Sequence, residues 1–128
     1  MIRLLVLAIL FIFLKSSLST QEDNFVLVKL DGNATIPLPA SANYRRIVQN
    51  ANYEDEEHLY RVCNGKNKKT CGFWENVKTK KKVASGATTY NKNKKALIVK
   101  KVRATDFGDY MTGNKKTQVR LLKLIVKG

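Results

Sequence analysis

The sequence has few of the residues on which small disulfide-held or metal-held proteins depend. Its 128 residues include two cysteines and one histidine. Two cysteines exclude a scaffold held by several disulfides, and they exclude a structural zinc site of four cysteines. A single histidine argues against zinc hydrolase chemistry, because such sites usually take two or three imidazole ligands. The chain must therefore fold around an apolar core, and its length fits one domain.

Acidic residues are also scarce. The chain has 10 Asp and Glu against 24 Lys and Arg, which gives a formal net charge of +14. The hydrophobic fraction of 44% argues against disorder in spite of this charge. The charge bears on solubility and on attraction to polyanions, and it does not bear on the fold.

The longest apolar run lies at the N-terminus. Arg3 precedes an uninterrupted apolar run over 4–14, and small residues follow up to Ser19. This pattern predicts a secretory signal peptide over 1–19 that is cleaved after Ser19. The alternative is a membrane anchor, but a helix over this run spans only about 16 Å, roughly half of the hydrocarbon core. We therefore expect a secreted, extracellular protein with one domain over 20–128.

An extracellular route permits two covalent modifications. Cys63 and Cys71 are the only cysteines, and an oxidising compartment favours their pairing in a short-range disulfide. The alternative is two free thiols at an incidental spacing. Asn33, followed by Ala34 and Thr35, stands in the one acceptor sequence for an N-glycan.

The remaining sequence is typical of β-structure. Val, Ile, Thr, Tyr and Phe gather in short runs separated by polar clusters. The runs cover 25–30, 34–38, 59–63, 71–77, 87–90, 96–102, 110–112 and 117–126. Their number and spacing predict a sandwich or a barrel. The polar segment 39–58 fits either an extra strand or a long loop, and the sequence does not decide between them.

The last run has two apolar phases. Leu122 and Leu124 share one phase, and Val119 and Leu121 share the other. We expect a bulge near Leu121 and Leu122 that turns both sets toward the core. The predicted core consists of Leu38, Val62, Trp74, Leu97, Val99, Leu122 and Leu124.

The most specific pattern covers 97–112. Apolar residues stand at Leu97, Val99 and Val102, and the sequence Asp106-x-Gly108-x-Tyr110-x-Thr112 follows. A glycine at this point permits a backbone conformation that costs energy for a residue with a Cβ atom. The alternative is an ordinary Asp-Gly loop between two unrelated strands.

This pattern resembles the E–F region of variable-type immunoglobulin domains. The resemblance implies an all-β, two-sheet antiparallel immunoglobulin-like sandwich in which Tyr110 is the buried tyrosine corner and Asp106 and Gly108 shape the turn. The segment around Cys63 and Cys71 is similar to the C–C′ hairpin of polymeric immunoglobulin receptor-like domains, which implies a second, short-range disulfide there.

The sequence departs from the family at several positions. The B–F disulfide is absent, because Thr112 holds the F position and Ala40 or Leu38 holds the B position. Val62 is expected at the place of the strand-C tryptophan. No arginine near Gly86 matches the family residue that pairs with the motif aspartate.

Lysine clusters are the main indication of function. The candidate polyanion-binding residues are Lys66, Lys68, Lys69, Lys78, Lys80, Lys81 and Lys82. Outside the cell, the possible partners are a sulfated glycan, an acidic protein or an anionic membrane surface. The excess of lysine over arginine and the few interleaved aromatics argue against nucleic acid. The alternative is a solubilising surface with no cognate ligand.

No catalytic pattern is present. The sequence lacks a nucleophile elbow, and His58 follows four acidic residues, which predicts a solvated loop histidine. The run 54–57 lacks the spacing and the glycine of a calcium loop. We predict no enzyme activity, cofactor or metal.

The predicted function is a secreted immunoglobulin-like binding module for an extracellular protein or anionic glycan. The alternative is a cationic defence protein that acts on anionic microbial surfaces.

Overall fold

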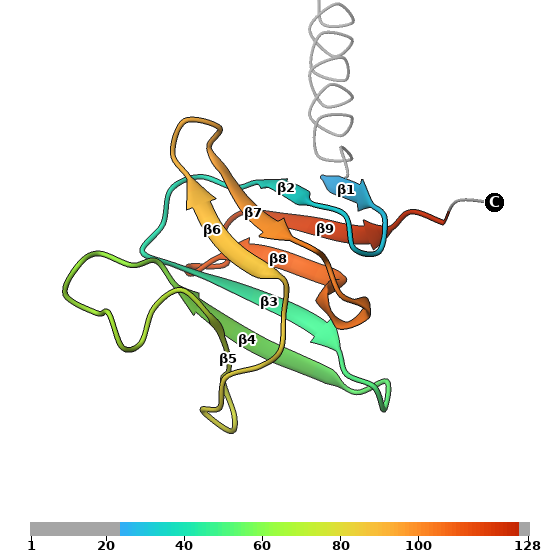
Figure 1. The fold of residues 1–128 in the computed structure, drawn as a ribbon, viewed down its shortest axis with the longest axis horizontal. Coiled ribbons are helices and arrows are strands. Elements are labelled where there is room, and N and C mark those ends of the chain that lie inside the picture. Colours follow the sequence, from blue (N-terminus) through green and yellow to red (C-terminus); the bar gives the residue numbers. More distant parts are fainter. Residues whose placement is uncertain (1–23, 126–128) are drawn as a thin grey trace, which may run out of the picture.

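The computed structural model describes residues 24–125 (Figure 1). The predicted signal peptide over 1–19 and its cleavage site lie outside these residues. The described part forms nine strands and one short 3-10 helix, η1 (Ala104–Asp106). The strands are β1 (Phe25–Val28), β2 (Ala34–Pro37), β3 (Asn43–Gln49), β4 (Asp55–Arg61), β5 (Trp74–Asn76), β6 (Ala87–Asn91), β7 (Ala96–Lys100), β8 (Gly108–Thr112) and β9 (Gln118–Lys123).

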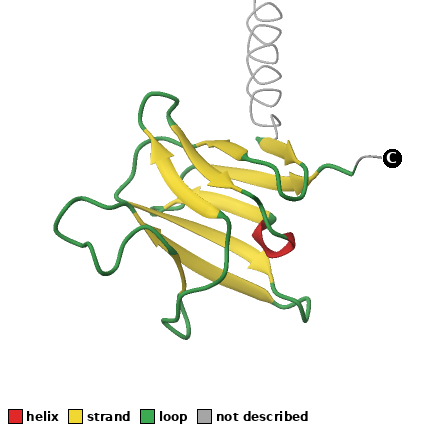
Figure 2. Ribbon diagram, viewed as in Figure 1, coloured by secondary structure: helices red, strands yellow, loops and turns green. Residues whose placement is uncertain are grey.

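The strands form two sheets, and the core lies between them (Figure 2). The larger sheet has the order β1-β9-β8-β3-β4-β5, and the smaller has the order β2-β7-β6. In the strand nomenclature of immunoglobulin-like sandwiches, the larger sheet corresponds to A′GFCC′C″ and the smaller sheet to BED. The prediction of a two-sheet immunoglobulin-like sandwich is therefore confirmed.

One strand pair departs from the antiparallel expectation. β1 runs parallel to β9, and Leu27 lies opposite Leu122. After β1 the chain crosses to the smaller sheet through a tight turn in which Asp31 takes a φ of 67°. This turn is held by hydrogen bonds of 2.9 Å from Asp31 N to Val102 O and from Val102 N to Gly32 O. The crossing leaves β1 free to pair with the last strand of the larger sheet.

Residues 39–58, which the sequence left open, contain β3 and most of β4. In β3 the side chains of Tyr44, Arg46 and Val48 face the core, and the residues between them face outward. This alternation has the period of two that a strand requires. The inward arginine hid the pattern, because it interrupts the run of apolar residues on the core side.

The predicted core is right at four positions and wrong at two. Leu38, Trp74, Leu97 and Val99 are buried, and Val62 is partly buried against them. Leu122 and Leu124 are each 39% exposed. The expected bulge is absent, since β9 alternates regularly and places Val119 and Leu121 inward. A strand without a bulge cannot turn both phases to one face.

The predicted C–C′ hairpin is displaced by one strand. Cys63 and Cys71 lie between β4 and β5, which correspond to C′ and C″, so strand C is β3. Val62 follows β4 and does not hold the strand-C position; Tyr44 stands on β3 opposite Thr112. Of the two candidates for the B position, Leu38 is buried and Ala40 is exposed, so Leu38 holds the core position.

Candidate functional site

A buried ion pair connects β3 to the helical turn before β8. The side chains of Arg46 and Asp106 are both 0% exposed, and Arg46 Nη1 lies 2.9 Å from Asp106 Oδ1. β3 places Arg46 inward by its alternation, and η1 ends at Asp106. The arginine on β3 thus fills the role for which no arginine near Gly86 is available. Before the structure, only the motif aspartate without a partner near Gly86 pointed to such an arginine.

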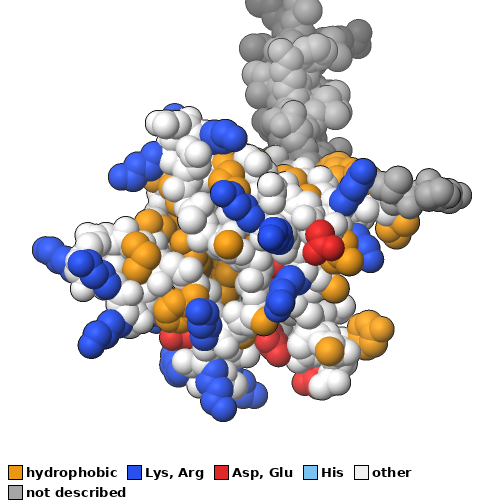
Figure 3. Space-filling view, viewed as in Figure 1, with side chains coloured by type: hydrophobic (Ala, Val, Ile, Leu, Met, Phe, Trp, Pro, Cys, Tyr) orange, Lys and Arg blue, Asp and Glu red, His pale blue; other side chains and the backbone are white. Residues whose placement is uncertain are grey.

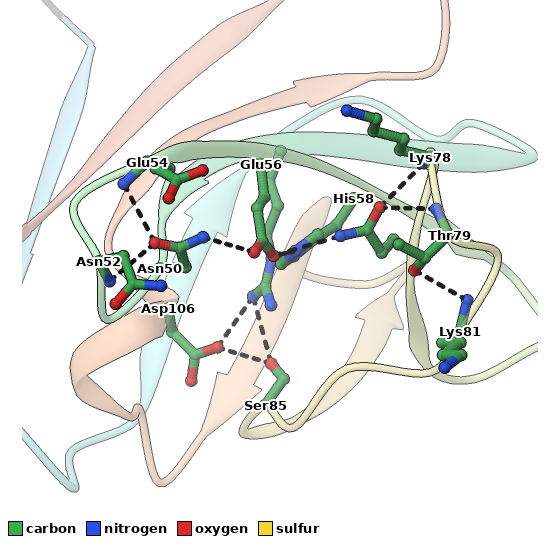
Figure 4. A network of polar contacts seen from close by, with 12 residues as sticks. Asn50, Asn52, Glu54, Glu56, His58, Lys78, Thr79, Lys81, Ser85 and Asp106 are labelled. Atoms are coloured by element: carbon green, nitrogen blue, oxygen red, sulfur yellow. Dashed lines mark hydrogen bonds and ion pairs between the residues drawn. The ribbon is translucent and has the colours of Figure 1, made fainter.

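The carboxylate of Asp106 accepts four hydrogen bonds. Oδ1 accepts from Arg46 Nη1 and, at 2.7 Å, from Ser85 Oγ. Oδ2 accepts from Gly86 N at 3.0 Å and from Arg103 N at 2.8 Å. Figure 4 shows Asp106 and Ser85 turned toward each other. Because every oxygen is used, the aspartate fixes the start of β6 and both ends of η1.

Tyr110 completes the turn that the sequence motif implies. Its ring is buried, and its hydroxyl donates to Asp106 O at 2.6 Å and accepts from Arg46 Nη1 at 2.9 Å. Burial raises the pKa of the Tyr110 hydroxyl to about 12. Gly108 is required nearby, because a Cβ atom there would overlap the carbonyl oxygen of Ile47. The three motif residues therefore form one structural unit.

His58 is buried, so the expectation of a solvated loop histidine is wrong. β4 turns it toward the core opposite Arg46, whose Nε donates to His58 Nδ1 at 2.9 Å. The other ring nitrogen must then carry the proton, and it lies 2.9 Å from Glu56 Oε1 (Figure 4). Burial lowers the pKa of His58, and the hydrogen bond from His58 lowers the pKa of Glu56.

The aromatic side of this network is Trp74. The guanidinium of Arg46 lies 4.4 Å from the centre of the Trp74 ring, and Trp74 Nε1 donates to Thr88 Oγ1 at 2.9 Å. Tyr60 and Tyr110 pack against the same ring at 5.4 and 5.6 Å. Since these groups are buried and mutually bonded, the network holds the two sheets together and offers no open site for a substrate.

The first lysine loop joins β4 to β5. Cys63 and Cys71 close it in a disulfide with Cα atoms 5.0 Å apart. Asn64 and Asn67 use their side-chain oxygens to bind backbone N–H groups within the loop. The loop surrounds an open concavity of about 390 Å³. Its three lysines, Lys66, Lys68 and Lys69, are exposed.

The second lysine loop joins β5 to β6. Asn76 Oδ1 accepts hydrogen bonds from Lys78 N and Thr79 N. The chain then turns back, and the backbone of Lys82 forms an isolated antiparallel β-bridge with Glu75. Lys82 Nζ lies 5.4 Å above the ring of Phe73. Its other lysines, Lys78, Lys80 and Lys81, are exposed, as is Lys82. The predicted lysines therefore lie in two loops at opposite ends of β5, where Figure 3 shows two basic clusters.

Asn33 lies at the surface just before β2. Both Asn33 and Thr35 are exposed, and Asn33 Oδ1 accepts from Lys101 N at 3.2 Å. The acceptor sequence is thus accessible from solvent in the folded domain.

Comparison with known proteins gives two structural neighbours. The first is the extracellular domain of the voltage-gated sodium channel beta4 subunit, described in parallel homodimer structures. It is 12% identical with a TM-score of 0.44, and the match covers 83% of this chain and 88% of that chain. The second is a chicken TCR, 13% identical with a TM-score of 0.37 and coverage of 83% and 56%. These similarities are too distant to bear on function.

No family model matches the chain. No curated protein matches it either.

Acid is expected to destabilise the fold through the His58 network. Below about pH 6.5, the ordinary pKa of His58, the unfolded chain gains a proton that the folded protein resists. Below about pH 4.5 the same holds for Glu56. The free energy of unfolding should therefore fall as the pH drops from 7.5 to 4. Urea midpoints across this range measure the effect, and a midpoint that rises on acidification contradicts it.

The control for this pH dependence is His58→Gln. A glutamine side-chain oxygen can still accept from Arg46 Nε, but it does not titrate. The fall between pH 7 and 5 should become shallower in this variant, whereas a smaller fall below pH 4.5 should remain, because Asn50 and Asn76 still donate to Glu56.

Within residues 24–125, no group of three or more His, Cys, Asp or Glu is arranged to hold a metal ion. The same part of the chain has no helix that is long and apolar enough to cross a membrane.

Proposed function

We propose that the chain is a secreted, single-domain immunoglobulin-like binding module that recognises a sulfated glycan through its two lysine loops. The signal-peptide pattern over 1–19 and the cysteine pair support an extracellular site of action. The mature domain is then 20–128. A binding role, and not an enzymatic one, agrees with a polar network that is closed to solvent.

The observation that carries the proposal is the gathering of seven exposed lysines in the two loops at the ends of β5. None of the lysines of the two loops forms an ion pair within the described residues. Two acidic residues on the outer face of the larger sheet are instead neutralised by ion pairs. Glu57 pairs with Arg45 and Lys115, and Glu75 pairs with Arg61. The two loops thus hold seven lysines whose charge no acidic side chain of the described residues neutralises through an ion pair.

The form of this surface favours a long, flexible polyanion. The two loops are separated by the length of β5, about 10 Å for three residues. A linear chain of sulfates can contact both clusters, whereas a single phosphate contacts one. Lysine is a flexible point charge, which suits a sulfate chain better than the bidentate recognition that arginine provides.

The proposal is tested by salt elution from a heparin matrix. The triple variant Lys80→Ala, Lys81→Ala, Lys82→Ala should elute at clearly lower salt than the unmodified protein. The matched control removes Lys92, Lys94 and Lys95 in the turn between β6 and β7. Each set contains one lysine with positive φ, Lys80 at 64° and Lys95 at 50°. Screening shortens the Debye length from about 10 Å at 0.1 M to about 3 Å at 1 M, so salt separates the variants.

The control should elute close to the unmodified protein. If both triple variants shift equally, the attraction is non-specific and the two-loop site is wrong. That outcome favours the alternative function, a cationic defence protein that acts on anionic microbial surfaces through its net charge.

A further inference from the structure

The exposed apolar side chains of the described residues gather at one edge of the larger sheet. Six of the eight large exposed hydrophobic residues lie on β1, on β9 or directly after them. They are Phe25, Leu27, Leu30, Leu122, Leu124 and Ile125. Phe25 and Leu27 are 52% and 50% exposed. Such a cluster marks an interaction surface or an aggregation risk in a soluble protein.

The strand register makes part of this cluster continuous. Leu27 on β1 lies opposite Leu122 on β9 in the parallel pair. Arg120, Leu122 and Phe25 share the outward phase, because Val119 and Leu121 face the core. A strip of large apolar side chains therefore runs along the outer face at the β1 edge, where Figure 1 shows β1 and β9 side by side.

Among the edge strands of the described residues, β1 alone combines an uncharged, proline-free sequence with large apolar side chains that are exposed. The edge strand β2 ends in Pro37, and the edge strand β5 is covered by the bridge between Glu75 and Lys82. β6 exposes Thr89 and no large apolar side chain. β1 has the sequence Phe-Val-Leu-Val, with no charge and no proline. Natural edge strands usually carry one of these devices to prevent association.

The hydrogen bonds of β1 leave two residues free to pair. Asn24 O accepts from Arg120 N, and Val28 O accepts from Leu124 N, each on the side of β9. In a parallel ladder only alternate residues bond to a given neighbour. The backbone groups of Phe25 and Leu27 therefore point away from β9, toward the open edge.

We propose that β1 pairs with β1 of a second copy of this chain, antiparallel and about a two-fold axis at Val26. Phe25 of each copy then exchanges two backbone hydrogen bonds with Leu27 of the other. Paired residues keep their side chains on the same face, so Phe25 packs on Leu27 of the second copy across the axis. The larger sheets of two copies become one continuous sheet.

The absence of charge in β1 supports a second copy as the occupant. Its four residues, Phe-Val-Leu-Val, include no ionisable side chain. The two-fold axis at Val26 puts Lys29 of the two copies at opposite ends of the contact. The chain carries a net charge of +14, so two copies meet most easily where no like charges face each other.

Sedimentation velocity over a wide range of protein concentration tests the proposal. The protein recovered from expression of the full chain should form a dimer whose fraction rises with concentration. Leu27→Lys should raise the dissociation constant about tenfold or more, because it puts a charge opposite Phe25 of the other copy and brings the two introduced lysines to diagonal positions across the axis. The matched control is Ile47→Lys, which replaces an exposed apolar residue on β3 of the same outer face.

Two further variants keep the test decisive if Leu27→Lys fails to fold. Phe25→Lys should weaken the dimer, and Phe25→Lys combined with Leu27→Glu should restore it, because each introduced ammonium group then lies opposite an introduced carboxylate of the other copy. A protein that stays monomeric at all concentrations overturns the proposal. A loss of dimer that is equal in Leu27→Lys and Ile47→Lys also overturns it, because it indicates packing through the whole outer face. Heparin elution of the same variants reports the glycan site separately.

Discussion

Asp106→Asn is expected to lower the free energy of unfolding by about 3–5 kcal/mol, the usual cost of leaving one buried charge without its partner. The guanidinium of Arg46 would stay buried opposite a neutral amide. Asparagine also offers one oxygen where the carboxylate accepts four hydrogen bonds. For a domain of this size the midpoint of thermal unfolding should fall by roughly 15–25 °C. Urea denaturation followed by the fluorescence of the single tryptophan measures the loss.

A double-mutant cycle with Arg46→Met separates the ion pair from its surroundings. The double variant has no uncompensated buried charge, so its loss should be smaller than the sum of the single losses by about 1–3 kcal/mol. Strictly additive losses would mean that the two side chains do not interact in solution.

Trp74→Ala is expected to cost about 3–5 kcal/mol, the range for removing a buried large aromatic side chain. Trp74 is 1% exposed, and its ring contacts Arg46 as well as two tyrosines. Alanine leaves a cavity and removes the surface on which the guanidinium rests. Circular dichroism during urea denaturation measures the change, because the variant has no tryptophan to report it.

The matched variant is Trp74→Phe. It keeps an aromatic ring in the core and removes mainly the hydrogen bond to Thr88 Oγ1. Its cost should be about 1–2 kcal/mol. If phenylalanine and alanine cost the same, the hydrogen bond and not the packing of the ring accounts for the stability at this position.

The sequence predicted the part of the fold in which local pattern and tertiary structure agree. The turn around Asp106, Gly108 and Tyr110 was predictable through its resemblance to the E–F region of immunoglobulin domains. The burial of Leu97 and Val99 followed from simple alternation. These residues were sufficient for the fold class.

The rest depended on partners that are distant in the sequence. Arg46 lies 60 residues before Asp106, and a charged side chain is ordinarily expected at the surface. His58 was misplaced for the same reason, since its acidic neighbours indicated solvent. Leu122 and Leu124 were predicted in the core because apolar character was equated with burial. The exposed strip at β1 shows that apolar character does not predict burial in a strand that has apolar residues on both faces, because only one face lies against the core.

The lysines of the candidate site were predictable as residues but not as a surface. Their exposure follows from charge alone. Their division into two loops depends on β5, a strand of only three residues that the sequence placed in a longer run. The position of Lys82 beside Phe73 depends on a bridge between Glu75 and Lys82 that no local pattern indicates.

The parallel pairing of β1 with β9 also determines how the domain responds to a mechanical load. A pull on Asn24 and on Ile125 acts along two strands that run in the same direction, and the two forces point in opposite directions. The strands must slide past each other, so their hydrogen bonds are strained together in shear. A hairpin opened from its end loses its bonds one after another at low force. Tension between the two ends of the described chain is therefore carried by the whole β1–β9 ladder at once.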